Sequence, residues 1–98
     1  MKKETEVLLM SYQNQFYNDI DSYKKRYGDQ KIDYAIFNFL IESTYARYIG
    51  HLDTLYDVDR ISYTDWKKYY DQANKYCDDC RRRIRKAELE PSDPVEEG

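Results

Sequence analysis

Hydrophobic residues recur every three or four positions along three long segments of the chain. In the first segment the spaced apolar residues are Leu9, Tyr12, Phe16, Ile20, Tyr23 and Tyr27. This spacing places their side chains on one stripe of an α-helix. Gly28 follows the stripe directly, and glycine at C′ takes a positive φ without steric cost. The pattern therefore predicts a helix from about Lys3 to about Tyr27, ended by Gly28.

The second segment carries apolar residues on two sides. Its main stripe is Tyr34, Phe37, Ile41, Tyr45, Tyr48, Leu52 and Leu55, and a nearly opposite set is Ile32, Ile36, Phe39 and Ala46. Asp29 or Asp33 is expected to cap this helix. The run 34–41 also fits a buried strand, but the chain offers no second strand to pair with it. A helix that is apolar on two sides is expected to lie between two neighbours or against another molecule.

The third segment follows a turn at residues 56–62, where Ser62 or Thr64 can cap a new helix. Its apolar face holds Trp66, Tyr69, Tyr70, Ala73, Cys77, Cys80, Ile84 and Ala87. Pro91 and Pro94 make a helical continuation unfavourable. We therefore predict a helix from about Tyr63 to about Ala87, followed by an acidic tail at 91–98 whose composition is typical of disorder.

Together the patterns predict an all-α fold with three helices. The second and third helices form a long antiparallel hairpin, and the first helix packs along it. The chain has 98 residues, which suits a single domain, so residues 1–90 are expected to form one helical domain and residues 91–98 a tail. We also expect the first helix to cover part of the second apolar set, and the remainder to favour a homodimer through the second helix.

The net charge of −3 conceals an uneven distribution along the chain. Residues 81–86 carry five positive charges, whereas the residues from 88 onward carry five carboxylates and no base. The rest of the chain is mildly acidic, which argues against a general DNA-binding domain. No apolar run approaches the roughly 18 residues that span a bilayer, and the first residues do not resemble a signal peptide. The sequence therefore predicts a cytoplasmic protein without a membrane segment.

Cys77 and Cys80 form a C-x-x-C motif, which raises the questions of zinc binding and of redox chemistry. Both lie in the middle of the apolar stripe, where cysteine behaves as a small hydrophobe. Zinc needs about four ligands, and His51 would lie on the order of 12 Å from Cys77 in the predicted hairpin. A reactive pair usually needs a helix N-terminus, and this pair lies deep inside a helix. We therefore predict core packing, with no metal and no cofactor.

Five cations follow the second cysteine and form what we call the basic collar: Arg81, Arg82, Arg83, Arg85 and Lys86. They cannot share one face of a helix, so they splay around it. Their structural role is to offset the negative end of the helix dipole, and they can also attract the acidic tail. Their functional interpretation is nucleic-acid contact, which makes a small nucleic-acid-binding or regulatory protein the alternative function.

Catalytic motifs are absent from the sequence. There is no Glu-x-x-His or H-E-x-x-H motif, no glycine-rich phosphate loop and no G-x-S-x-G elbow. A lone histidine beside the apolar stripe, His51, is interpreted as structural. The sequence therefore predicts a protein that is not an enzyme.

The remaining signal is a surface on which aspartates and tyrosines interleave. Twelve of the 98 residues are tyrosine, which combines a large apolar ring with a polar tip. The members expected to collect around the turn, called here the turn set, are Asp53, Tyr56, Asp57, Asp59, Tyr63 and Asp65. One interpretation is a solvated face. The other is a contact surface on which tyrosines anchor a partner and aspartates pair with its Arg and Lys side chains.

The turn at 56–66, Tyr-Asp-Val-Asp-Arg-Ile-Ser-Tyr-Thr-Asp-Trp, and the Asp/Tyr-rich helical body resemble small accessory proteins of phages and mobile elements. This class includes anti-CRISPR and other anti-defence inhibitors. The resemblance implies an inhibitor or adaptor that occludes a larger nucleic-acid-processing protein such as a nuclease. It carries over no catalytic or binding residues, because the class shares none. The basic collar departs from the pattern of a pure DNA mimic.

Overall fold

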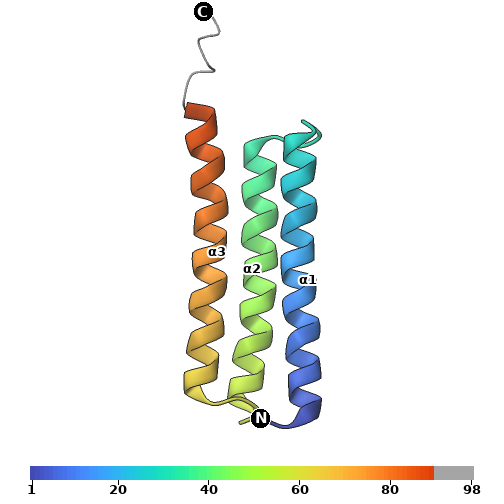
Figure 1. Ribbon diagram of the computed structural model, residues 1–98, viewed down its shortest axis with the longest axis vertical. Coiled ribbons are helices and arrows are strands. Elements are labelled where there is room, and N and C mark those ends of the chain that lie inside the picture. Colours follow the sequence, from blue (N-terminus) through green and yellow to red (C-terminus); the bar gives the residue numbers. More distant parts are fainter. Residues whose placement is uncertain (90–98) are drawn as a thin grey trace, which may run out of the picture.

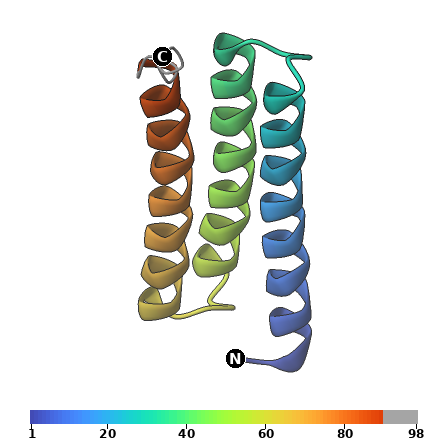
Figure 2. The same ribbon diagram turned by 45° about the horizontal axis from the view of Figure 1, so that its top comes forward.

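The computed structural model describes residues 1–89, with side chains through residue 86, and contains three helices and no strand in that range. They are α1 (Lys3–Gly28), α2 (Tyr34–Asp57) and α3 (Tyr63–Leu89). α2 lies between α1 and α3 and runs antiparallel to both (Figure 1), and the tilted view in Figure 2 shows the same order. The predicted all-α, three-helix arrangement is confirmed. The tail predicted at 91–98 lies outside the described residues.

Gly28 is the last residue of α1 and does not take the C′ position that the sequence predicted for it. Gly28 is still helical, and the left-handed residue is Gln30, with φ of 61°. The Gln30 N–H donates to the Tyr27 carbonyl (3.0 Å), and the Lys31 N–H donates to the Arg26 carbonyl (2.9 Å). This pair of hydrogen bonds is a Schellman motif, which satisfies the free carbonyls at a helix end. The prediction of Gly28 at C′ is therefore wrong by two residues.

α2 ends with the same motif, built on Asp59 at φ of 60°. The Asp59 N–H donates to the Tyr56 carbonyl (3.0 Å), and the Arg60 N–H donates to the Leu55 carbonyl (2.8 Å). At the other end of α2, the carboxylate of Asp33 accepts the N–H of Ile36 at 2.9 Å. Of the two predicted caps for α2, Asp33 is therefore the one used.

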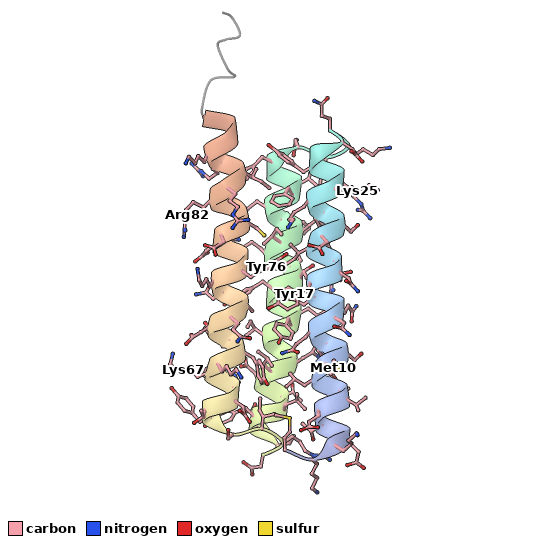
Figure 3. All side chains as sticks on the ribbon, viewed as in Figure 1. Met10, Tyr17, Lys25, Lys67, Tyr76 and Arg82 are labelled. Carbon is pink, nitrogen blue, oxygen red and sulfur yellow. The ribbon has the colours of Figure 1, made fainter. Side chains whose placement is uncertain are left out.

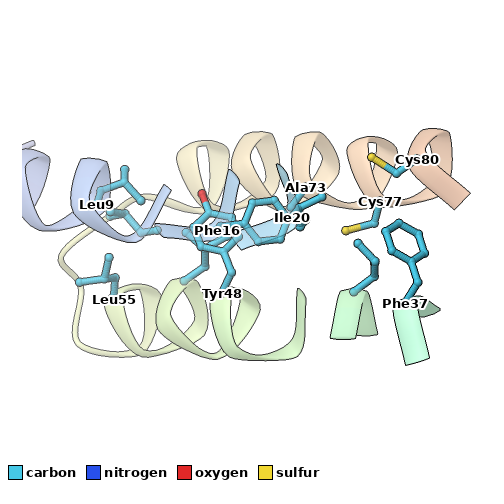
Figure 4. Packing of buried hydrophobic residues seen from close by; sticks show 12 residues of the cluster. Leu9, Phe16, Ile20, Phe37, Tyr48, Leu55, Ala73, Cys77 and Cys80 are labelled. Atoms are coloured by element: carbon cyan, nitrogen blue, oxygen red, sulfur yellow. The ribbon is translucent and has the colours of Figure 1, made fainter. Parts of the chain in front are cut away.

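The core follows the predicted stripes. Figure 4 shows buried side chains from all three helices meeting in one row along the bundle, including Phe16, Phe37 and Cys77. The sequence did not identify three further buried residues: Thr5, Thr44 and Ile61. The hydroxyl groups of Thr44 and Tyr23 lie 3.0 Å apart and form a hydrogen bond. The hydroxyl of Thr5 has no hydrogen-bond partner among the described residues.

The second apolar set, at the start and along one side of α2, is covered only in part. Ile32 packs against the core, but Ile36 is 47% exposed and Phe39 is 66% exposed. Ala46 is also exposed. α2 lies between two neighbours, yet both of them contact its main stripe and the flanks of that stripe.

α1 and α3 meet through long aromatic side chains. The rings of Tyr17 and Tyr76 lie 4.9 Å apart at an angle of 85°, between the two helices (Figure 3). The hydroxyl of Tyr76 donates to Asp21 at 3.2 Å. Tyrosine therefore fills the space between two helices whose backbones are not in direct contact. Within residues 1–89, no helix combines the length and apolar character needed to cross a bilayer.

Candidate protein-binding surface at the turn end of the bundle

An unbroken series of aromatic rings runs along the junction of α2 and α3 near the turn. We call it the aromatic row, and its members are Tyr45, Tyr56, Tyr63, Trp66 and Tyr70. The centroid of the Trp66 ring lies 5.7 Å from that of Tyr56, 5.7 Å from that of Tyr63 and 5.2 Å from that of Tyr70. The Tyr45 and Tyr70 rings follow at 6.5 Å. Ring pairs at these separations stabilise one another beyond their simple burial.

A carboxylate on α2 fixes the central ring of the row. The indole Nε1–H of Trp66 donates to Oδ1 of Asp53 at 2.8 Å. A hydrogen bond to an ionised acceptor is stronger than a neutral one, so it restricts the rotation of the indole. The same contact joins the last turns of α2 to the first turn of α3. Asp53 therefore acts as a support for the row, a role that the sequence did not reveal.

The row is half-buried at one end and open at the other. Burial, together with a hydrogen bond to Tyr70, raises the pKa of Tyr45, so this hydroxyl stays protonated. By contrast, Tyr56 is 38% exposed and Tyr63 is 55% exposed. These two rings are large apolar groups in contact with solvent, held in place by Trp66. They are the part of the row that a partner can reach.

The turn set does not form one continuous patch. Asp53, Tyr56 and Tyr63 meet at Trp66 on the α2–α3 side, through the contacts given above. Asp59 and Asp65 instead line a pocket of about 820 Å³ with the first residues of the chain, Met1, Lys2 and Thr5. Tyr63 and Asp65 lie two positions apart on α3 and therefore point about 200° apart, whereas Asp59 lies in the connection that follows α2.

The carboxylates of the turn set differ in their pairing. Asp53 accepts the hydrogen bond from the Trp66 indole. Asp57 is exposed and forms no hydrogen bond or ion pair through its side chain with another described residue. The side chains of exposed Asp59 and half-buried Asp65 likewise form no hydrogen bond or ion pair with another residue of 1–86. Three carboxylates are therefore available to a partner around the turn.

At the opposite end of the bundle, the fold adds cations to the basic collar. α1 and α3 run in the same direction, so Lys24, Lys25 and Arg26 of α1 lie at the end where the collar lies (Figure 3). Lys31 follows in the connection to α2. We call this region the basic end. Only the topology brings these segments together, because they lie fifty or more positions apart in the sequence.

Several collar cations already have partners inside the protein. Arg81 pairs with Glu42 at 2.6 Å and with Asp78 at 3.1 Å. Arg82 pairs with Asp79 at 3.2 Å. Pairs of this kind within the chain reduce the charge that the collar offers to a nucleic acid.

The two cysteines occupy the core, as the stripe predicted. Cys77 is 1% exposed, and burial raises the pKa of its thiol to about 12 although Arg81 opposes the shift. Burial also raises the pKa of the Cys80 thiol. A reactive thiol needs the opposite shift. Within the described residues, no three His, Cys, Asp or Glu side chains gather into a group that could hold a metal ion.

His51 packs against α1 and not against the cysteine side of the bundle. Its ring stacks on that of Tyr12 at 3.9 Å and 3°. This contact fits the structural role expected of it. Comparison with protein-family models, curated proteins and solved structures gave no match for the chain. The functional argument therefore rests on the surfaces of the molecule.

Proposed function

We propose that this chain is a non-enzymatic binding protein, an inhibitor or adaptor, whose turn end docks on a larger protein. The observation that carries the proposal is the pair of exposed rings, Tyr56 and Tyr63, held by the hydrogen-bonded Trp66. Tyrosine and tryptophan are enriched among the residues that dominate binding energy at interfaces. Rings that are already fixed lose little conformational freedom when a partner binds.

The charge around these rings indicates the kind of partner. Asp57, Asp59 and Asp65 offer carboxylates on both sides of the turn, and complementary potentials steer association and select partners. A basic groove is the complementary surface. Grooves of this kind follow nucleic-acid backbones, so the partner that fits best is a nucleic-acid-processing protein such as a nuclease.

Affinity capture from a bacterial lysate tests this proposal. The wild type is compared with the charge reversal Asp57→Lys/Asp59→Lys/Asp65→Lys. The matched control is Asp21→Lys/Asp29→Lys/Asp78→Lys, which changes the net charge equally at exposed positions far from the turn. We expect a captured protein that the turn variant loses and the control retains. Equal capture by all three proteins would refute the role of the turn end.

A second candidate is nucleic-acid binding at the basic end. It is supported by the addition of Lys24, Lys25, Arg26 and Lys31 to the collar. Binding of this kind falls steeply with salt, and each lost phosphate contact lowers the slope of log K against log salt by about one. If the wild type captures no protein but retains duplex or single-stranded nucleic acid at physiological salt, this second candidate replaces the first.

A further inference from the structure

One side of α2 faces away from the bundle and carries no charge over about five helical turns. Figure 4 shows α2 on one side of the row of buried side chains, so the far side of this helix points out of the protein. We call that side the outer face, and its members recur every three or four positions: Ile36, Phe39, Ser43, Ala46, Gly50 and Thr54. An exposed face of this kind marks an interaction surface when it includes large apolar groups.

The outer face changes from large to small side chains along its length. Ile36 is 47% exposed and Phe39 is 66% exposed, so both apolar groups contact solvent. Ala46, Gly50 and Thr54 are also exposed but add little bulk. A Cβ added to Gly50 would meet no other atom within 4 Å, so the space above the helix is open there. One half of the face therefore projects, and the other half has room for a projecting side chain.

Two charges of opposite sign lie at the ends of this face. Asp57 is the last residue of α2 and follows Phe39 by 18 residues, which is about five full turns, so the two lie on one line along the helix. Lys31 lies at the other end, in the connection before α2. Both are exposed, and within residues 1–86 neither side chain forms a hydrogen bond or ion pair with another residue.

We propose that a second copy of this chain docks on the outer face, with the two α2 helices antiparallel. When Phe39 of one copy lies over Gly50 of the other, positions whose numbers add up to 89 face each other. The large half of each face then meets the small half of the other, in the manner of knobs and holes. The same alignment places Asp57 beside Lys31 of the second copy, and two-fold symmetry makes this ion pair twice.

A parallel pairing of the same faces fits less well. It would place the two Phe39 rings over each other and leave the two Gly50 positions facing an empty space. It would also bring Asp57 against Asp57 and Lys31 against Lys31, and like charges across an interface are unfavourable. The antiparallel pairing instead lays the basic end of each copy along the acidic turn end of the other. Shape and charge therefore select the same orientation.

This arrangement gives a geometry to the homodimer expected from the sequence. A single pair of helices is a contact at the low end of interface sizes, so we expect a dissociation constant on the order of 10–100 µM. The ring of Tyr56 points about 100° away from Asp57 around α2, toward Trp66 on α3, and is not used. The inference is therefore independent of the partner proposed for the turn end.

Sedimentation equilibrium of the purified full chain tests the proposal over concentrations that bracket this constant. The mean mass of the wild type should rise from 12.0 kDa toward twice that value. Gly50→Arg should stay monomeric, because the added side chain fills the space that Phe39 of the second copy needs. The matched control is Gly28→Arg, since Gly28 is also helical and also open but lies on α1. The control should dimerise like the wild type.

Zero-length cross-linking tests the orientation of the two copies. A carbodiimide joins a lysine amine to a carboxylate in contact with it. Lys31 and Asp57 lie at opposite ends of α2, whose 24 residues span about 36 Å, so a cross-link between them forms only between two copies. We expect this cross-linked peptide by mass spectrometry in the wild type and its loss in Gly50→Arg.

Three outcomes would overturn the proposal. One is a wild-type mass of 12.0 kDa at every concentration, which would leave the face to a different protein. Another is a dimer that persists in Gly50→Arg, which would mean that another surface pairs. The third is a dimer without the Lys31–Asp57 cross-link, which would mean a different orientation. Circular dichroism shows that Gly50→Arg keeps its helices, as the higher helix propensity of arginine predicts. None of these results depends on a partner at the turn end.

Discussion

The two ends of the bundle both combine aromatic rings with charged groups, but they use them differently. At the basic end, Arg81 and Arg82 are tied to carboxylates of α2 and α3, and Lys24 to Asp21. At the turn end, two tyrosine rings face solvent while Asp57 forms no ion pair with another described residue. At least three cations of the basic end, Lys24, Arg81 and Arg82, are paired within the chain, whereas the turn end leaves two rings and Asp57 open to a partner.

This difference separates charges that stabilise the fold from groups available to a partner. Exposed ion pairs contribute little each, but they consume the charge that a nucleic acid would need. The cations also lie where two helix C-termini favour positive charge. The open rings and carboxylates of the turn end have no such explanation within the described part of the chain. This difference is the reason for proposing that a partner binds there.

The largest effect is expected at the basic end, where Phe37 fills the core. Its side chain is fully buried, so Phe37→Ala should lower the free energy of unfolding by about 3–5 kcal/mol. Chemical denaturation measures the loss. Phe39→Ala is the control, because this ring is 66% exposed, and it should change stability by less than about 0.5 kcal/mol. A Phe37→Ala protein as stable as wild type would place that ring outside the core.

Alkaline pH should destabilise the protein through Cys77. Burial raises the pKa of this thiol from its ordinary 9.0 to about 12, so the folded state keeps a proton that the unfolded state releases. The free energy of unfolding should therefore fall between about pH 9 and pH 12, by up to about 1.4 kcal/mol per pH unit.

Denaturation curves across this range, for wild type and Cys77→Ala, check the effect. Part of the slope should remain in the variant, because burial also raises the pKa of Tyr48 to about 12. An unchanged slope in Cys77→Ala would show that the nearby Arg81 cancels the effect of burial. The pKa of the Cys77 thiol would then be near its ordinary value in the folded protein, contrary to the effect of burial described here.

A smaller gain in stability is expected at the turn end from Thr5→Val. The Thr5 hydroxyl is buried without a hydrogen-bond partner in the described structure, so an isosteric methyl should stabilise by about 1 kcal/mol. Thr44→Val is the control and should destabilise by a similar amount, because that hydroxyl bonds Tyr23. Thermal melts show whether each variant raises or lowers Tm relative to wild type. A loss in Thr5→Val would indicate an undetected partner for its hydroxyl.

The smallest effect compares the two Schellman motifs, one at each end. Gln30 and Asp59 both have a positive φ, which glycine adopts without steric cost. Gln30→Gly should stabilise by about 0.5–1 kcal/mol, and Asp59→Gly by less, since aspartate tolerates this conformation better than glutamine. Precise denaturant midpoints measure the difference. The reverse order would mean that the Gln30 side chain contributes to stability.

The sequence predicted the helices and most of the core because a 3.6-residue period is a local property. It missed Thr5 and Thr44, since a polar residue on an apolar stripe gives no sign of its own burial. It also chose Gly28 over Gln30 for the left-handed position, because glycine is the usual occupant. In the structure α1 continues through Gly28 to the C-cap Asp29, so the left-handed position falls on Gln30.

The candidate surface was predicted only in part, because its composition is local but its arrangement is not. The sequence pattern identifies Tyr56 and Tyr63 as surface candidates, whereas it places Trp66 on the core stripe. Its contact with Asp53 depends on how α2 and α3 pack, thirteen positions apart in the sequence. The separation of Asp59 and Asp65 from the tyrosines likewise follows from which way each side chain points.

The most direct measurement of the central claim is the affinity of the captured partner for Tyr56→Ala/Tyr63→Ala. The control is Val7→Ala/Met10→Ala, which removes two other exposed apolar side chains, on α1. Anchoring rings at an interface typically cost at least 2 kcal/mol when truncated, so the tyrosine variant should bind roughly 30-fold or more weakly. The control should bind like wild type. Equal affinity of the tyrosine variant and wild type would contradict the assignment of the binding function to the turn end.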